Sequence, residues 1–189
     1  MAAADPTPAA RALARLRAGH RRFLERLRGD PPSARLELPQ THRPFAAVLG
    51  CADARTAPET IFDAPLGQLF VVRTAGQVPG REGLASLEFA VAALGVPLIV
   101  VLGHTRCGAL EAAVKPGPLP GHLKTLVDWI RAGLQDGPAE ADAAAAPHVR
   151  RVLAALREGS PVLERARAEG RLRLAGAVYD VASGKLSWL

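Results

Sequence analysis

Three short runs of mostly apolar residues stand out along the chain, at residues 45–50, 68–73 and 97–103. Each has the length of a strand and lacks the alternation of polar and apolar positions that a half-exposed strand shows. Continuous apolar runs of this length are typical of strands buried on both faces, as in parallel sheets. We therefore predict three core strands at these positions.

Between the second and third runs, residues 81–94 carry apolar side chains at helical spacing and end at Gly95, which predicts a crossover helix. A strand, a helix and a parallel strand form a βαβ unit with a right-handed connection. The predicted fold class is therefore α/β, a single domain whose mainly parallel central sheet is covered by helices on both faces.

The second half of the chain continues in the same way. Helical spacing predicts helices at 121–134 and 147–156, separated by an Ala-rich acidic linker at 136–146 that we expect at the surface. Ser160 and Pro161 form an N-cap and a first-turn proline, which open another helix. Residues 171–179 alternate as a strand, and a turn at residues 183–184 leads into a last strand at 185–188.

The N-terminal residues have a different character. Thr7 and Pro8 open a helix that stops at residues 29–32, and its apolar positions recur at helical spacing among arginines that contribute much of the net charge of +6. We predict an amphipathic helical arm over residues 1–36, ahead of an α/β domain over residues 37–189. The arginines are read as the solvated face of this arm, and no nucleic-acid partner is predicted.

No targeting or membrane segment is expected. Residues 1–10 have no charged region followed by an apolar run, so they are not read as a secretory signal. The Arg-rich residues 11–28 suit a transit peptide less well than an arm, because serine is absent and acidic Asp5 and Glu25 are present. The most apolar segment, 89–102, is interrupted by Gly95 and Pro97 and is shorter than the roughly 20 residues of a spanning helix. The expectation is a soluble, cytoplasmic protein with no membrane partner.

The candidate chemistry follows two of the predicted strands. The only two cysteines of the chain lie in two short cassettes, Cys51-Ala-Asp53-Ala-Arg55 and His104-Thr-Arg-Cys107. Thiolates and imidazole favour Zn²⁺, and a site with three such protein ligands keeps a fourth position for water. Although the cassettes are about fifty residues apart, the carboxyl ends of strands beside a switch in strand order can bring them together.

Each cassette also allows a local prediction. If the chain stays extended, Cys51, Asp53 and Arg55 point the same way, whereas His104 and Cys107 are spaced to grip one ion from a single helical turn. Three alternatives stay open at this point. They are a disulfide between the cysteines, a structural zinc with Asp53 as fourth ligand, and a plain surface ion pair of Asp53 with Arg55.

The two cassettes resemble the Cys-x-Asp-x-Arg and His-x-x-Cys motifs of the β-class carbonic anhydrases. The resemblance continues through residues 58–63, 69–76, 86–91, 99–103 and 176–180. It implies the reversible hydration of carbon dioxide to bicarbonate and a proton, with Zn²⁺ held by Cys51, His104 and Cys107. It also implies that Asp53, kept ionised by Arg55, accepts the proton of a water whose pKa zinc lowers from about 15.7 to about 7.

The substrate pocket and the assembly follow from the same resemblance. The family often has glutamine where this chain has His42, shares the phenylalanine at Phe70, and often has tyrosine where this chain has Phe89. These three residues are therefore predicted to bind substrate, with a loop histidine and ordinary core packing as the alternatives. Because family members form dimers through an N-terminal arm, we expect a homodimer or a larger homo-oligomer.

Two competing functions remain at this stage. The same scaffold could hydrolyse carbonyl sulfide or carbon disulfide, or it could be a closed zinc module that senses bicarbonate without turnover. In the closed form Arg55 releases Asp53, which becomes the fourth ligand; some members of the family are reported to switch in this way with pH or bicarbonate. The nominal proton shuttles are His20, His42, His122 and His148.

Overall fold

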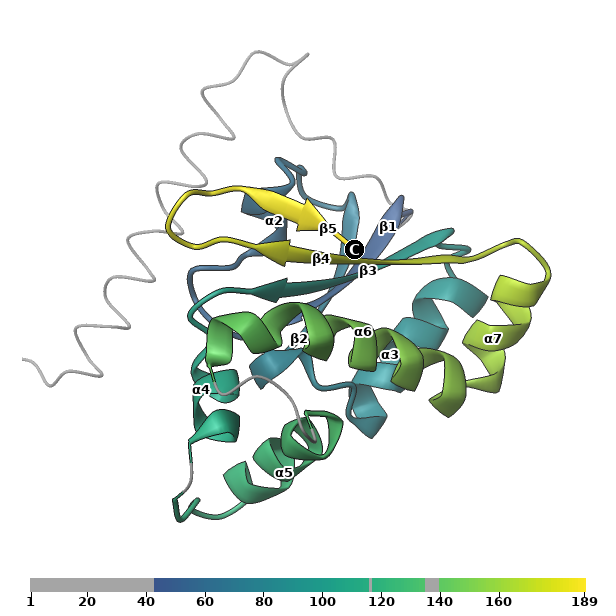
Figure 1. Cartoon of the computed structure of the whole chain (residues 1–189). Helices are drawn as coiled ribbons and strands as arrows, with labels where there is room; N and C mark the ends of the chain where they lie inside the picture. Colours follow the sequence, from purple (N-terminus) through teal and green to yellow (C-terminus); the bar gives the residue numbers. More distant parts are fainter. Residues whose placement is uncertain (1–42, 116, 135–139) are drawn as a thin grey trace, which may run out of the picture. The chain divides into compact units, whose positions relative to one another are not determined.

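The computed structural model describes residues 43–115, 117–134 and 140–189. In this part of the chain, one sheet has the strand order β2-β1-β3-β4-β5 (Figure 1). Its first four strands run parallel, and β5 is an antiparallel edge strand. The strands are β1 (Ala46–Cys51), β2 (Leu69–Thr74), β3 (Leu98–His104), β4 (Arg173–Tyr179) and β5 (Leu186–Trp188). The three predicted core strands are confirmed to within one residue at each end.

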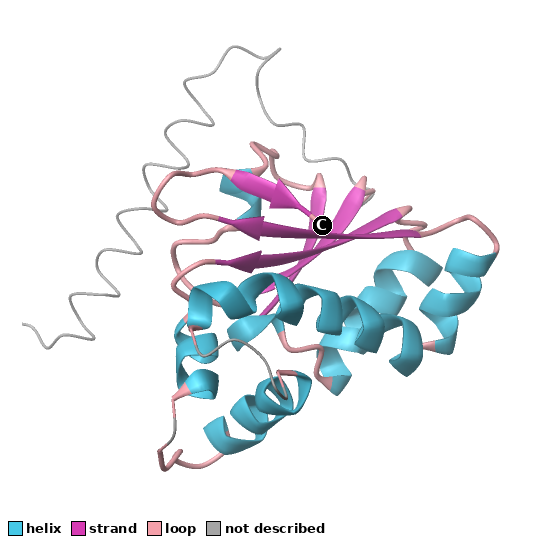
Figure 2. Ribbon diagram, in the orientation of Figure 1, coloured by secondary structure: helices cyan, strands magenta, loops and turns pink. Residues whose placement is uncertain are grey.

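The largest apolar cluster lies between the sheet and three helices on one of its faces (Figure 2). These helices are α3 (Arg81–Ala92), α6 (Ala141–Gly159) and α7 (Pro161–Ala168). Successive residues of β1 serve opposite faces, since Leu49 joins this cluster and Val48 joins another that includes Ile61 and Phe62. Among the described residues, only the short helix α2 (Pro58–Ile61) packs on that second face. The α/β class with a mainly parallel sheet is confirmed.

Two more helices lie below the carboxyl ends of β1 and β3. They are α4 (Gly108–Val114) and α5 (Leu123–Gly133), and a one-turn 3₁₀ helix, η1 (Ala75–Gln77), follows β2. Their apolar side chains form a cluster with Cys51 and Cys107. The pattern predicted α5 and the crossover helix α3, but it did not predict α2, α4 or η1, whose few turns are too short for a clear periodicity.

The predicted linker before residue 147 is wrong where the structure describes it. Helix α6 begins at Ala141, and Pro147 lies inside the helix instead of opening it. Ala144 and Ala145 are fully buried beneath the sheet. Burial of these small side chains outweighs the one backbone hydrogen bond that Pro147 cannot make, because tertiary packing contributes most of a helix's stability.

The C-terminal elements agree with the prediction. Ser160 caps α7, since its hydroxyl oxygen accepts a hydrogen bond from the backbone N–H of Leu163 at 3.1 Å. Strands β4 and β5 are joined by a turn in which Gly184 has φ +72°. The predicted N-terminal arm, residues 1–36, lies outside the described residues. None of the helices in the described part of the chain is long and apolar enough to cross a membrane.

The strand order places a switch point between β1 and β3. The chain moves from β1 outward to β2 and then crosses back to β3 on the other side of β1. In open parallel sheets ligands bind beyond the carboxyl ends of the strands at such a point. Both cassettes follow these two strands, so the fold itself marks this end of the sheet.

Candidate metal centre

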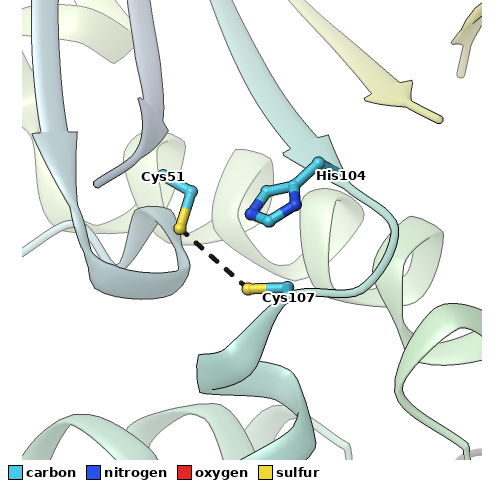
Figure 3. Close-up of side chains that lie close together, drawn as sticks. All are labelled: Cys51, His104 and Cys107. Carbon is cyan, nitrogen blue, oxygen red and sulfur yellow. Dashed lines mark hydrogen bonds between the residues drawn. The ribbon is translucent and has the colours of Figure 1, made fainter. Parts of the chain in front are cut away.

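Three candidate ligand atoms meet at the switch point (Figure 3). Cys51 is the last residue of β1, His104 is the last residue of β3, and Cys107 directly precedes α4. Their ligand atoms all lie within 4.8 Å of one another, and the two sulfurs are 4.0 Å apart. All three residues are at most 5% exposed. The two cassettes therefore meet, as the strand order predicted, and both cysteines are free thiols instead of the alternative disulfide.

The imidazole of His104 is oriented as a metal ligand would be. Its Nδ1 lies 2.8 Å from the backbone carbonyl oxygen of Thr105, which can only accept, so Nδ1 carries the proton. The other nitrogen, Nε2, is buried and has no hydrogen-bond partner among the described residues. A buried acceptor without a partner costs free energy, and a cation among the three ligand atoms would remove that cost.

The two thiols differ in acidity. Hydrogen bonds from the Cys107 thiol and from the backbone N–H groups of Asp53 and Gly76 lower the pKa of Cys51 to about 4 despite its burial. The Cys51 thiolate in turn raises the pKa of Cys107. Cys51 is therefore ionised first, and a divalent cation would displace the proton of Cys107. Two sulfurs and one imidazole nitrogen form a donor set that fits Zn²⁺.

Asp53 does not join the ligand atoms. Its carboxylate accepts two side-chain hydrogen bonds from Arg55, from Nε at 2.9 Å and from a terminal nitrogen at 2.6 Å. A third comes from the backbone N–H of Arg55 at 2.9 Å. Arg55 thus holds the pKa of Asp53 well below its usual range. In the part of the chain that the structure describes, no carboxylate therefore joins the three ligand atoms.

The predicted extended path from Cys51 to Arg55 is wrong. Strand β1 ends at Cys51, and the chain turns, with the backbone N–H of Thr56 donating to the carbonyl of Asp53 at 3.1 Å. The pair of Asp53 and Arg55 is therefore produced by this turn, in which the Asp53 side chain bonds the backbone two residues on. Alternation along a strand has no part in it.

The second cassette also forms a turn, and this turn is not helical. Arg106 has φ +55°, and α4 begins only after Cys107, so the predicted single helical turn is wrong. The backbone N–H of Arg106 donates to Asp142 at 2.5 Å, and its carbonyl accepts from Arg55 at 2.9 Å. Arg55 therefore ties the first cassette to the second, which a plain surface ion pair would not do.

Two residues of the site were missed by sequence reasoning. Arg73, at the end of β2, donates to the backbone carbonyls of Cys51 at 2.7 Å and Asp53 at 2.5 Å, and so fixes the backbone around the first cysteine. Asp142, described above, lies in the segment that was expected to be a surface linker. The only signal for Arg73 was a charged residue closing an apolar run; Asp142 had none.

Phe70, one of the predicted pocket residues, does not lie at this cluster within one chain. Phe70 pairs with Ala47, four positions before the pair of Cys51 with Thr74, which is about 13 Å along the strand. The Phe70 ring lies 6.4 Å from that of Phe89, which is 54% exposed. His42 lies outside the described residues. Whether these three residues bind substrate stays a prediction.

The histidines differ as proton carriers. His148 is fully buried on α6, and its Nε2 lies 2.7 Å from the carbonyl oxygen of Gly76. Burial also lowers the pKa of His148. The His148 side chain therefore has no direct contact with solvent. His122 is exposed, whereas His20 and His42 lie outside the described residues.

Two thiols and one imidazole that meet beyond the carboxyl ends of parallel strands form the three-ligand donor set of a catalytic zinc site. Comparison with known proteins agrees. Residues 46–186 match a family model described as carbonic anhydrase. The chain is 39% identical to a carbonic anhydrase of Mycolicibacterium smegmatis over 185 residues, covering 90% of this chain and 88% of the relative. Carbonic anhydrase 2 of Mycobacterium tuberculosis is 38% identical, covering 90% and 87%.

Solved structures give the same result. A β-carbonic anhydrase from Coccomyxa, in complex with acetazolamide, superposes with a TM-score of 0.82 at 25% identity, covering 94% of this chain and 86% of that one. One from Aspergillus fumigatus superposes with a TM-score of 0.81 at 28% identity, covering 94% and 90%. This chain belongs to the β-class carbonic anhydrase family. The predicted class of enzyme, a carbonate dehydratase, is confirmed at the level of this family.

Proposed function

We propose that this protein catalyses the zinc-dependent, reversible hydration of carbon dioxide to bicarbonate and a proton. The observation that carries the proposal is the gathering of two sulfurs and one unpartnered imidazole nitrogen within 4.8 Å, with Asp53 held beside them by Arg55. Cys51, His104 and Cys107 would hold the ion. Zinc bound there would supply the Lewis acidity that makes water a nucleophile at neutral pH.

The residues around the ligands perform the remaining tasks. Asp53 is ionised and can only accept hydrogen bonds, so it orients a reacting water. It also accepts the proton of that water and passes it on to solvent. Arg55 keeps this carboxylate charged and turned away from the ligand atoms through two parallel hydrogen bonds. Arg73 holds the backbone of both Cys51 and Asp53, so the ligand and the proton acceptor keep a constant spacing.

The proposal is tested by stopped-flow hydration of carbon dioxide across a pH series, with zinc analysis of the same sample. We expect about one zinc per chain and a rate that increases above neutral pH. Chelation should abolish the rate and added Zn²⁺ should restore it. Full zinc occupancy without turnover at any pH would contradict the proposal and favour a closed module. Preferential turnover of carbonyl sulfide or carbon disulfide in competition would favour the other enzyme.

The active form is proposed to be a homodimer or a larger homo-oligomer. A chain from the crystal structures of two tetrameric β-carbonic anhydrases of Sordaria macrospora is similar to this one, with a TM-score of 0.70 at 25% identity, covering 96% of this chain and 93% of that one. Phe45 and Phe89 are more than half exposed, which favours a covering partner. Because Phe70 and Phe89 lie far from the chain's own cluster, a substrate wall built from them would serve a neighbouring copy. Light scattering after gel filtration measures the assembly, and a monomer would contradict it.

A cytoplasmic location is also proposed. Its support is the pair of buried, reduced thiols, which a reducing compartment preserves. Fractionation of the native cells would test it, and recovery in an exported fraction would contradict it.

A further inference from the structure

The backbone of Gly76, in η1, makes a direct contact with Cys51, one of the candidate metal ligands. Its backbone N–H donates to the sulfur of Cys51 at 3.3 Å. Gly76 has φ +62°, and a Cβ at this position would lie 3.0 Å from atoms of both Ala109 and Ile130. The next residue, Gln77, also has a positive φ of 44°. A left-handed φ costs a glycine nothing, but Gln77 is not a glycine, so its conformation persists only where surrounding contacts hold it in place.

His148 supplies one of these contacts from a distant helix. From α6 its Nε2 lies 2.7 Å from the carbonyl oxygen of Gly76, 72 residues away in sequence. Since a carbonyl only accepts, Nε2 carries the proton and His148 is the donor. The remaining ring nitrogen, Nδ1, is buried and has no partner within residues 43–115, 117–134 and 140–189. Burial lowers the pKa of His148, which keeps the ring neutral.

The ring of His148 is itself held in one orientation. Trp129 of α5 meets it edge to face, with ring centroids 5.9 Å apart and an interplanar angle of 85°. Trp129 also contacts Arg151, whose guanidinium lies 5.6 Å from the centre of the Trp129 ring. Helices α5 and α6 therefore place one rigid hydrogen-bond donor beneath the strained turn.

We propose that His148 is a positioning residue for the metal centre, which anchors Gly76 so that its N–H stays bonded to Cys51 and thereby sets how strongly this thiolate binds the ion. The physical reason is that an N–H donor to a sulfur takes up part of its negative charge, and partners of this kind orient and tune metal ligands. The inference rests on the proposed metal site but not on the identity of the substrate.

Three substitutions separate this role from simple packing. His148→Leu keeps a similar volume but removes the donor, whereas His148→Gln retains an N–H group near the position of Nε2. Val152→Ala is the matched control, because Val152 is also fully buried on α6 but belongs to the cluster under the sheet and has no bond to Gly76. Urea unfolding of each variant measures the general loss of stability.

The readouts are zinc affinity, by competition with a chromophoric chelator, and the sulfur-to-metal charge-transfer band of the Co²⁺-substituted protein. We expect His148→Leu to bind zinc about 10-fold more weakly and to shift the band, while His148→Gln stays near wild type. Unchanged affinity and band in folded His148→Leu would overturn the inference. An equal change in Val152→Ala would also overturn it, because the effect would then be general destabilisation.

A measurement on the unmutated protein keeps the test decisive if His148→Leu does not fold. In the ¹¹³Cd-loaded protein, the Gly76 amide proton should show scalar coupling to the metal through Cys51, and His148 should carry its proton on Nε2. Absence of the coupling, or a proton on Nδ1, would overturn the inference. A wild-type protein that binds no metal would instead overturn the proposed site, so the two failures are distinguishable.

Discussion

The buried ligand residues and the more accessible pair of Asp53 and Arg55 beside them are built differently. Cys51, His104 and Cys107 are at most 5% exposed, whereas the side chains of Asp53 and Arg55 are 19% and 47% exposed. The first group ends two central strands, and the second belongs to a turn after one of them. Burial strengthens the attraction of thiolates for a cation, while exposure lets a carboxylate pass protons to water. The difference separates holding the ion from moving the proton.

The largest effect is expected from substituting a buried ligand residue, because both ion binding and proton transfer should then be lost. Cys51→Ser replaces a soft thiolate by a poor zinc ligand, so zinc content should fall to near zero and hydration by more than about 1,000-fold. Metal analysis and stopped-flow assays measure the two losses. Ala52→Ser is the control, since it places a serine at the adjacent exposed position. Retained zinc with full activity in Cys51→Ser would break the comparison.

Substituting the partly buried Asp53 carboxylate should affect proton transfer but not ion binding. Asp53→Asn keeps the shape of the side chain but removes the proton acceptor, so kcat should fall by about 100- to 10,000-fold with zinc content unchanged. Glu59→Gln, an exposed acid of α2, is the matched control. If zinc were lost together with activity in Asp53→Asn, Asp53 would belong with the buried ligands.

Substituting Arg55 tests the comparison further, because this residue connects Asp53 to the cassette that carries the buried ligands His104 and Cys107. Arg55→Ala should lower kcat by about 10- to 100-fold without loss of zinc, and Arg55→Lys should be intermediate because it lacks the two-pronged grip. The pKa of Asp53 is depressed in the wild type, so its ionised form persists into strong acid and is lost only there. Removing Arg55 raises this pKa toward its usual value. Activity of Arg55→Ala should then decrease further on acidification than that of the wild type, as a pH series of kcat would show; parallel profiles would contradict this.

The smallest effect is expected from substituting Asp142, which bonds the turn of the second cassette from helix α6. Asp142→Ala removes the acceptor for the Arg106 N–H in a turn with positive φ, which should lower the free energy of unfolding by about 1 kcal/mol and speed zinc release a few-fold. Urea unfolding and chelator-induced release measure these changes. Glu140→Ala serves as control, since it removes an exposed acid two residues away. No difference between the two variants would show that the turn needs no such support.

Much of the fold could be predicted because its signals are local. The core strands are continuous apolar runs, and α7 begins at a serine followed by proline. The start of α6 could not be predicted, because Pro147 suggests a helix start and only burial of Ala144 and Ala145 beneath the sheet shows otherwise. The three ligand candidates were found from the chemistry of their side chains, whereas Arg73 and Asp142 act through backbone contacts that leave no pattern.

By itself, the sequence determined which donor atoms exist and that they follow apolar strands, because residue type and hydrophobic pattern are properties of short segments. Tertiary structure alone decided that Cys51 and Cys107, 56 positions apart, place their sulfurs 4.0 Å from each other. It also decided that turns, not an extended strand and a helix, present the two cassettes. The physical reason is that these contacts depend on closing long loops through a packed sheet, and no segment of the chain contains that information alone.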